Sequence, residues 1–191
     1  MGAALPNLFH ETVQAAFVEE MARWTQEGRR PALFWRDDDL TRPLPSVRRF
    51  IETSNRTRVP IVFAAIPSAL TAEAVALVAD SDLCGIAVHG FAHHSHAAPG
   101  QPSSEYPAGR GIDEVRAELR EGRQRIRALA GELAIDMFVP PWGRFDPIYR
   151  DLLVEEGYTW ISGEKKLGDP SRYRDDKPDG RVGRPARPDY A

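Results

Sequence analysis

Short apolar runs alternate along most of this chain with longer segments whose apolar residues recur at helical spacing. The apolar runs predict strands over residues 33–36, 59–65, 84–88, 135–139 and 158–162, and the second of them is rich in β-branched residues. Other segments predict helices over residues 8–28, 44–52, 71–80, 113–133 and 146–156. Apolar residues at helical spacing indicate the first, second and fourth of these helices, and the third segment is rich in alanine. We expect Asp113 to cap the fourth of these helices and Asp146-Pro147 to open the fifth.

The alternation of strands and helices indicates the class of fold. The strands are apolar along their whole length, which is typical of a parallel sheet covered by helices. A closed eight-stranded barrel needs about 250 residues as a rule. The chain has 191 residues, and residues 164–191 form a charged tail rich in proline and glycine that we expect to be irregular. We therefore predict an α/β fold with an open or incomplete barrel, as a single domain over residues 1–163 that includes the first helix.

Composition and charge narrow the expected partners and location. The chain is 42% hydrophobic and 28% charged, and its net charge of −3 does not favour binding to nucleic acid or to an anionic membrane. No run approaches the ~20 apolar residues of a membrane span, and the N-terminus lacks the features of a signal peptide. We expect a cytoplasmic protein, and the sequence predicts no oligomeric state. The single cysteine, Cys84, lies in an apolar run and is expected to be buried.

Residues with metal-binding chemistry follow two of the predicted strands. Four of the five histidines are clustered, and His89 and His93 lie four residues apart where a strand ends. Asp37, Asp38 and Asp39 follow another apolar strand. The carboxyl ends of parallel strands meet on one face of such folds, so these groups are expected to converge. Two histidines and one carboxylate are the ligand set of an open, catalytic divalent-metal site. A solvated turn or a helix cap is the other interpretation of the aspartates.

A rigid turn, Pro140-Pro141-Trp142-Gly143, follows a third strand. Either this turn only ends the strand and Trp142 packs in the core, or Trp142 forms a wall of a groove for sugar rings. The loop over residues 90–111 is long enough to predict a functional or mobile segment. His94 and His96, in this loop, are expected to lie outside the ligand set.

Three motifs in order resemble those of the polysaccharide deacetylases of carbohydrate esterase family four. That family's first motif, Thr-Phe-Asp-Asp-Gly, is similar to residues 35–39, Trp-Arg-Asp-Asp-Asp. Its second, His-Ser/Thr-x-x-His, is similar to residues 89–93, and its third, Arg-x-Pro-x-Gly, to residues 139–143. The resemblance covers roughly residues 31–163. It implies an incomplete, distorted (β/α) barrel with a mainly parallel sheet.

The resemblance also implies an activity. The family's enzymes are metal-dependent hydrolases that remove an acetyl group from N-acetylated sugars. A divalent ion, usually zinc, is held by one aspartate and two histidines, which here would be His89 and His93. The substrate would be an oligosaccharide or a small N-acetylated sugar or related amide, and Trp142, Pro141 and Arg36 would line its site.

The resemblance does not determine which aspartate is the catalytic base and which is the metal ligand. The family's catalytic base is the aspartate that precedes the ligand. We prefer Asp38 as the base and Asp39 as the ligand, because Arg36 then stands where the family has a polar residue. In the other register Asp37 is the base and Asp38 the ligand.

The chain also departs from the family's motifs. Gly90 replaces the hydroxyl residue of the second motif, and Val139 replaces the arginine that orients the catalytic aspartate. Arg36 or Arg144 is expected to substitute for that arginine. The family supplies a late histidine as proton donor to the leaving amine, and no histidine follows His96. The resemblance therefore implies a divergent member that uses another group, or a truncated one.

Two other classes of function remain open from the sequence. One is a catalytically impaired metal- or carbohydrate-binding remnant that lacks the late histidine. The other is a non-haem iron oxygenase, which uses two histidines and one carboxylate as well. The alternation of strands and helices disfavours the oxygenase. If the chain is instead a structural domain without a metal, chelators are expected to change neither its stability nor its activity.

Overall fold

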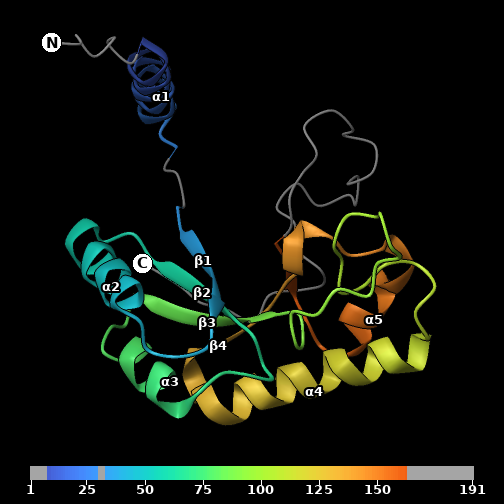
Figure 1. Ribbon diagram of the computed structural model, residues 1–191. Helices are drawn as coiled ribbons and strands as arrows, with labels where there is room; N and C mark the ends of the chain where they lie inside the picture. Colours follow the sequence, from blue (N-terminus) through green and yellow to red (C-terminus); the bar gives the residue numbers. More distant parts are fainter. Residues whose placement is uncertain (1–7, 30–32, 163–191) are drawn as a thin grey trace, which may run out of the picture. The chain divides into compact units, whose positions relative to one another are not determined.

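The computed structural model describes residues 8–29 and 33–162, and the chain divides into two units, Met1–Leu33 and Phe34–Ala191 (Figure 1). The described part of the first unit is dominated by one helix, α1 (Leu8–Gln26), which agrees with the helix predicted over residues 8–28. Its membership of the same domain as the sheet stays a prediction. The tail predicted over residues 164–191 lies outside the described residues.

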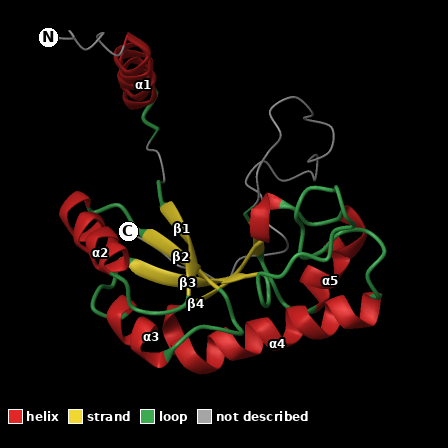
Figure 2. Cartoon of the chain, viewed as in Figure 1, coloured by secondary structure: helices red, strands yellow, loops and turns green. Residues whose placement is uncertain are grey.

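The second unit contains the alternating elements that the sequence predicts (Figure 2). Its described strands are β1 (Trp35–Leu40), β2 (Ile61–Ala65), β3 (Cys84–His89), β4 (Ala134–Val139) and β5 (Trp160–Ile161). Its described α-helices are α2 (Pro45–Thr57), α3 (Ala72–Val78), α4 (Ile112–Ala130) and α5 (Arg150–Glu155). Short 3-10 turns occupy Gly131–Leu133, Pro141–Gly143 and Pro147–Tyr149.

The sheet is parallel throughout, and its strands lie in the order β1-β2-β3-β4-β5. When spatial order follows chain order and every crossover has the usual right hand, the connecting helices all fall on one face of the sheet. Figure 2 shows α2, α3 and α4 along the same side of the strands. This is the winding of a (β/α) barrel rather than of a doubly wound sheet.

The two faces of the sheet bury different sets of residues. In β2, Ile61, Phe63 and Ala65 belong to the large hydrophobic cluster that includes residues of the helices. The alternate residues Val62 and Ala64 belong to a second, smaller cluster on the opposite face, called here the inner face. The other buried members of the inner cluster are Ala87, Met137 and Val139.

An arginine shows that the sheet curls. Arg36 in β1 donates hydrogen bonds through Nη1 to the backbone oxygen (3.0 Å) and the Oγ (2.6 Å) of Ser162, directly after β5. β1 and β5 are the two edge strands, and in a flat sheet with strands about 4.8 Å apart they would be separated by roughly 19 Å. An arginine and a serine cannot span that distance. The fold is therefore the incomplete, curled (β/α) barrel that the sequence predicts.

β1 differs from its prediction. The sequence predicts a strand over residues 33–36 with the aspartates after it, but the strand runs from Trp35 to Leu40 and includes all three aspartates. It pairs regularly with β2 as far as Asp37, and the register shifts before Leu40. Backbone pairing with β2 and this bulge keep a polar sequence inside the sheet, which hydrophobic periodicity does not reveal.

The two predicted helix caps have different outcomes. Asp146 does act as a cap, because its side chain accepts a hydrogen bond from the Ile148 N–H at 3.1 Å, ahead of the turn that leads into α5. The expectation for Asp113 is wrong. α4 begins at Ile112 with Gly111 at the cap position, so Asp113 lies inside the first turn.

Two further findings concern burial and membranes. Cys84 is a buried, free cysteine at the start of β3, as predicted. Within residues 8–29 and 33–162, no helix combines the length and the apolar character needed to cross a membrane.

Candidate metal centre

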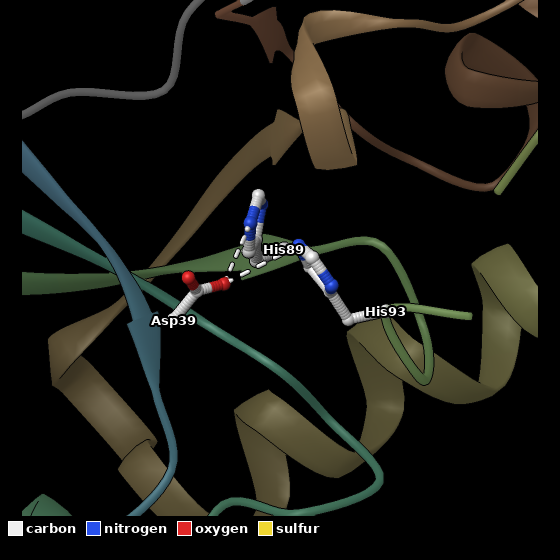
Figure 3. Close-up of side chains that lie close together, drawn as sticks. All are labelled: Asp39, His89 and His93. Carbon is white, nitrogen blue, oxygen red and sulfur yellow. Dashed lines mark ion pairs between the residues drawn. The ribbon is translucent and has the colours of Figure 1, made fainter. Parts of the chain in front are cut away.

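Side chains from two strands and one loop converge at the carboxyl ends of the strands. Asp39 of β1, His89 at the end of β3 and His93 in the following loop point toward one another (Figure 3). The Nε2 atoms of His89 and His93 lie 3.2 Å and 3.4 Å from the same Oδ1 of Asp39. Ligands bound tetrahedrally at about 2.1 Å from one ion lie roughly 3.4 Å apart. The spacing of these three groups therefore suits a single divalent cation.

The surroundings of His89 leave one ring nitrogen free to bind a metal. The ring is buried, and its Nδ1 lies 2.9 Å from the backbone oxygen of Val139. A carbonyl only accepts hydrogen bonds, so Nδ1 carries the hydrogen. Burial lowers the pKa of His89, although the bond to Val139 and the nearby carboxylates of Asp38 and Asp39 oppose this shift. Nε2 is therefore the ring atom that faces Asp39, and in the neutral ring its lone pair would be available to a cation placed between them.

Backbone strain gathers at the same place. Four non-glycine residues of the described chain have a positive φ, and three of them are Asp39 (66°), His93 (54°) and Trp142 (55°). The left-handed conformation costs such residues about 1–2 kcal/mol each. Strain of this kind persists where the surrounding structure holds it, and it clusters at functional sites.

Asp38 is held next to the three-residue cluster by an arginine from its own strand. Arg36 donates from Nε to Oδ1 of Asp38 (2.7 Å) and from Nη2 to Oδ2 (3.0 Å). Arg36 pairs in the sheet with Val62 of the inner cluster, so Arg36 and Asp38 lie on the inner face. Arg144 instead donates to the backbone oxygen of Ser103 at 3.0 Å. Of the two arginines suggested by the sequence, Arg36 is the one that contacts this aspartate.

Asp37 lies on the other face of β1. Its partner in β2 is Phe63, a member of the helix-side cluster, and Trp35 on the same side of β1 packs against that cluster. Burial, followed by repulsion from the carboxylates of Asp38 and Asp39, raises the pKa of Asp37. Strand alternation thus favours Asp38 over Asp37 as the neighbour of the metal ligands.

The turn after β4 borders the cluster. The Trp142 ring is partly buried, and its centroid lies 4.2 Å from that of His93. Trp142 therefore contacts a proposed ligand instead of packing in either hydrophobic cluster. Pro141 is buried, and a substrate role for it stays a prediction.

The remaining two histidines of the motif region pair with each other. The rings of His94 and His96 are edge to face with centroids 5.2 Å apart. Burial, together with the charge of Arg110, lowers the pKa of His96. Neither residue belongs to the three-residue cluster of possible ligands.

Sequence reasoning missed one acidic residue near the site. Glu105 is 1% exposed, and its carboxylate accepts hydrogen bonds from the N–H groups of Phe91 and Ala92, between the two histidines. Glu105 lies in an irregular loop without periodicity, so no sequence pattern distinguishes it from a solvated surface residue.

Comparison with known proteins finds likenesses in structure alone. No family model matches the sequence, and no curated protein matches it. Among 23 solved chains that match, a de-N-acetylase from Aggregatibacter actinomycetemcomitans has a TM-score of 0.56 and 18% identity, over 88% of this chain and 85% of that one. A protein of Mycobacterium smegmatis assigned to the polysaccharide deacetylases has a TM-score of 0.52 and 23% identity, over 63% and 38% of the two chains. A family 4 carbohydrate esterase from Streptomyces lividans, solved with acetate, has a TM-score of 0.50 and 19% identity, over 66% and 59%.

These likenesses define the fold. The chain has the fold of the polysaccharide deacetylases, as its three motifs predict. It spans less than two thirds of the length of the Mycobacterium and Streptomyces proteins, and most of the length of the Aggregatibacter protein.

Proposed function

We propose that this protein is a metal-dependent hydrolase that removes an acetyl group from an N-acetylated sugar or a related amide. The observation that carries the proposal is the convergence of Asp39, His89 and His93 at the strand ends of a deacetylase fold. Imidazole and carboxylate donors suit zinc, which we propose as the ion. The solved relatives include proteins described as deacetylases and carbohydrate esterases, which supports this substrate class.

In this proposal Asp38 is the general base. A bound divalent cation would lower the pKa of a water molecule and polarise the amide carbonyl. Asp38 accepts the proton of the attacking water as the new C–O bond forms. The guanidinium group of Arg36 donates hydrogen bonds to both oxygens of that carboxylate, and it also donates one to Ser162. Arg36 thereby does the work that the family assigns to the arginine replaced here by Val139.

The substrate would lie against Trp142. An aromatic ring beside the metal ligands offers an apolar surface for a sugar ring, and Trp142 packs on His93 at the edge of the site. The C–N bond breaks to give acetate and an amine, and the leaving nitrogen must take up a proton. The family's late histidine has no counterpart after His96 in the 191-residue sequence, and no residue is assigned to this proton transfer. The cytoplasmic location stays a prediction.

Acetate release tests the proposed reaction. Zinc-loaded protein is expected to release acetate from chitooligosaccharides, because the site would then contain both the cation and the base. Removal of zinc with a chelator should abolish the release, and added zinc should restore it. Zinc binding without acetate release would contradict the hydrolase and favour the non-catalytic remnant. Iron-dependent oxygen uptake would favour an oxygenase.

A further inference from the structure

The backbone between His89 and His93 is held by groups from several parts of the fold. The Gly90 N–H donates to the backbone oxygen of Val139 in β4 at 3.2 Å. The Phe91 backbone oxygen accepts from the Ser68 N–H, in the segment after β2, at 3.0 Å. Two further N–H groups of this loop, those of Phe91 and Ala92, also donate hydrogen bonds. Their acceptor is a single carboxylate.

That carboxylate belongs to Glu105. The Phe91 N–H lies 3.2 Å from each of its two oxygens, and the Ala92 N–H lies 2.7 Å from Oε1. A buried carboxylate is costly unless it is hydrogen-bonded, and a buried N–H needs an acceptor. Burial raises the pKa of Glu105, while the bonds from Ala92 and Phe91 oppose that shift. Glu105 and the loop therefore satisfy each other's polar groups.

Two contacts hold the backbone at Glu105 and at the residue that follows it. Arg110 donates to the Glu105 backbone oxygen at 3.1 Å and forms two hydrogen bonds, at 2.9 Å and 2.7 Å, to Glu118 in α4. The next residue, Tyr106, is fully buried, and its ring packs edge to face on Phe138 of β4. The carboxylate thus projects from a rigid part of an otherwise irregular loop.

Gly90 makes the close approach of Glu105 possible. A Cβ added at Gly90 would lie 1.8 Å from Oε2 of Glu105 and 2.5 Å from Cγ of Pro141, and the residue has a φ of +59°. Both the space and the conformation therefore require glycine. The glycine that replaces the family's hydroxyl residue is explained by the buried carboxylate beside it.

We propose that Glu105 is a positioning residue, which fixes the backbone between the two histidine ligands and thereby holds His93 in its left-handed conformation beside His89 and Asp39. The inference rests on the proposed metal site, and it adds a residue outside the three motifs to the machinery of that site. Outer partners of this kind orient ligands, and their loss costs about 10–100-fold in metal affinity or activity.

Two measurements on Glu105→Ala and Glu105→Gln test this role. Competition with a chromophoric chelator measures the zinc affinity, which should fall about 10–100-fold in Glu105→Ala. Glu105→Gln keeps one acceptor oxygen and should show a smaller loss. Amide hydrogen exchange of the metal-free protein should show faster exchange at Phe91 and Ala92, by about tenfold or more in Glu105→Ala. The glutamine variant also covers the case in which the alanine variant fails to fold.

Glu156→Gln is the matched control. Glu156 is a carboxylate whose side chain is 7% exposed and which forms ion pairs with Arg116 and Arg120 of α4. Its replacement should lower thermal stability but leave the zinc affinity and the exchange at Phe91 and Ala92 unchanged. If wild type binds zinc and both Glu105 variants bind it within twofold of wild type, the positioning role is wrong. If wild type binds no zinc, the proposed function fails, and amide exchange alone then tests whether Glu105 fixes this backbone. Faster exchange at Phe91 and Ala92 in Glu105→Ala would support that role, and unchanged exchange would overturn it.

Discussion

Replacing Asp38 by asparagine is expected to reduce acetate release by a factor of about 10²–10⁴, the usual contribution of a general base. The amide has nearly the shape of the carboxylate but cannot accept the proton of the attacking water. It also offers Arg36 one acceptor oxygen in place of two. Zinc affinity should change little, since the proposed ligands are Asp39, His89 and His93. Steady-state acetate release and a zinc competition assay on the same preparations check both parts.

Asp37→Asn is the control for the register of the aspartates. Asp37 pairs with Phe63 and lies on the helix-side face of β1, so its replacement should leave acetate release within a few-fold of wild type. A large loss of acetate release in Asp37→Asn with zinc retained, together with loss of both zinc and acetate release in Asp38→Asn, would instead assign Asp37 as the base and Asp38 as the ligand.

Gly90→Ala is expected to destabilise the fold by about 3 kcal/mol, as the sum of left-handed strain and overpacking, and to weaken zinc binding. The new methyl group would overlap the Glu105 carboxylate and the Pro141 ring, and Gly90 lies directly between His89 and the rest of the loop. Urea unfolding of the metal-free protein measures the first effect, and zinc titration measures the second.

Gly100→Ala separates strain from overlap. Gly100 lies in the same loop with a φ of +81°, but a Cβ there would meet no atom within 4 Å. Its replacement should cost about 1 kcal/mol, from backbone strain alone, and should leave zinc affinity unchanged. Equal losses of stability and zinc affinity in the two variants would show that the close approach at Gly90 has no special role.

The alternation of apolar strands and periodic helices predicted most of the fold. Each described strand and α-helix overlaps a segment predicted from the sequence, and hydrophobic pattern selects most of these segments. β1 is the exception, because its aspartates occupy strand positions that only pairing with β2 and a bulge make possible. Hydrophobic periodicity indicates which residues are buried. It is therefore least informative where a polar strand lies beside a functional site.

The candidate site was predictable as far as its local motifs extend. His89, His93 and the aspartates are visible because rare residue types gather at predicted strand ends. The contact between Arg36 and Ser162 joins positions far apart in the sequence, so it emerges only from the curl of the sheet. Glu105 is similar, since its importance depends on which backbone N–H groups surround it. Tertiary burial of polar groups leaves no periodic trace in a single sequence.

Metal content tests the central claim most directly. After dialysis against zinc and then against metal-free buffer, wild-type protein is expected to retain about one zinc ion per chain. His89→Ala combined with His93→Ala should retain under about a tenth of that amount, because one carboxylate alone binds zinc weakly. His94→Ala combined with His96→Ala removes as many histidines from the same loop outside the cluster, and it should match wild type. Wild-type protein without zinc, or equal zinc in all three proteins, would contradict a metal centre at Asp39, His89 and His93.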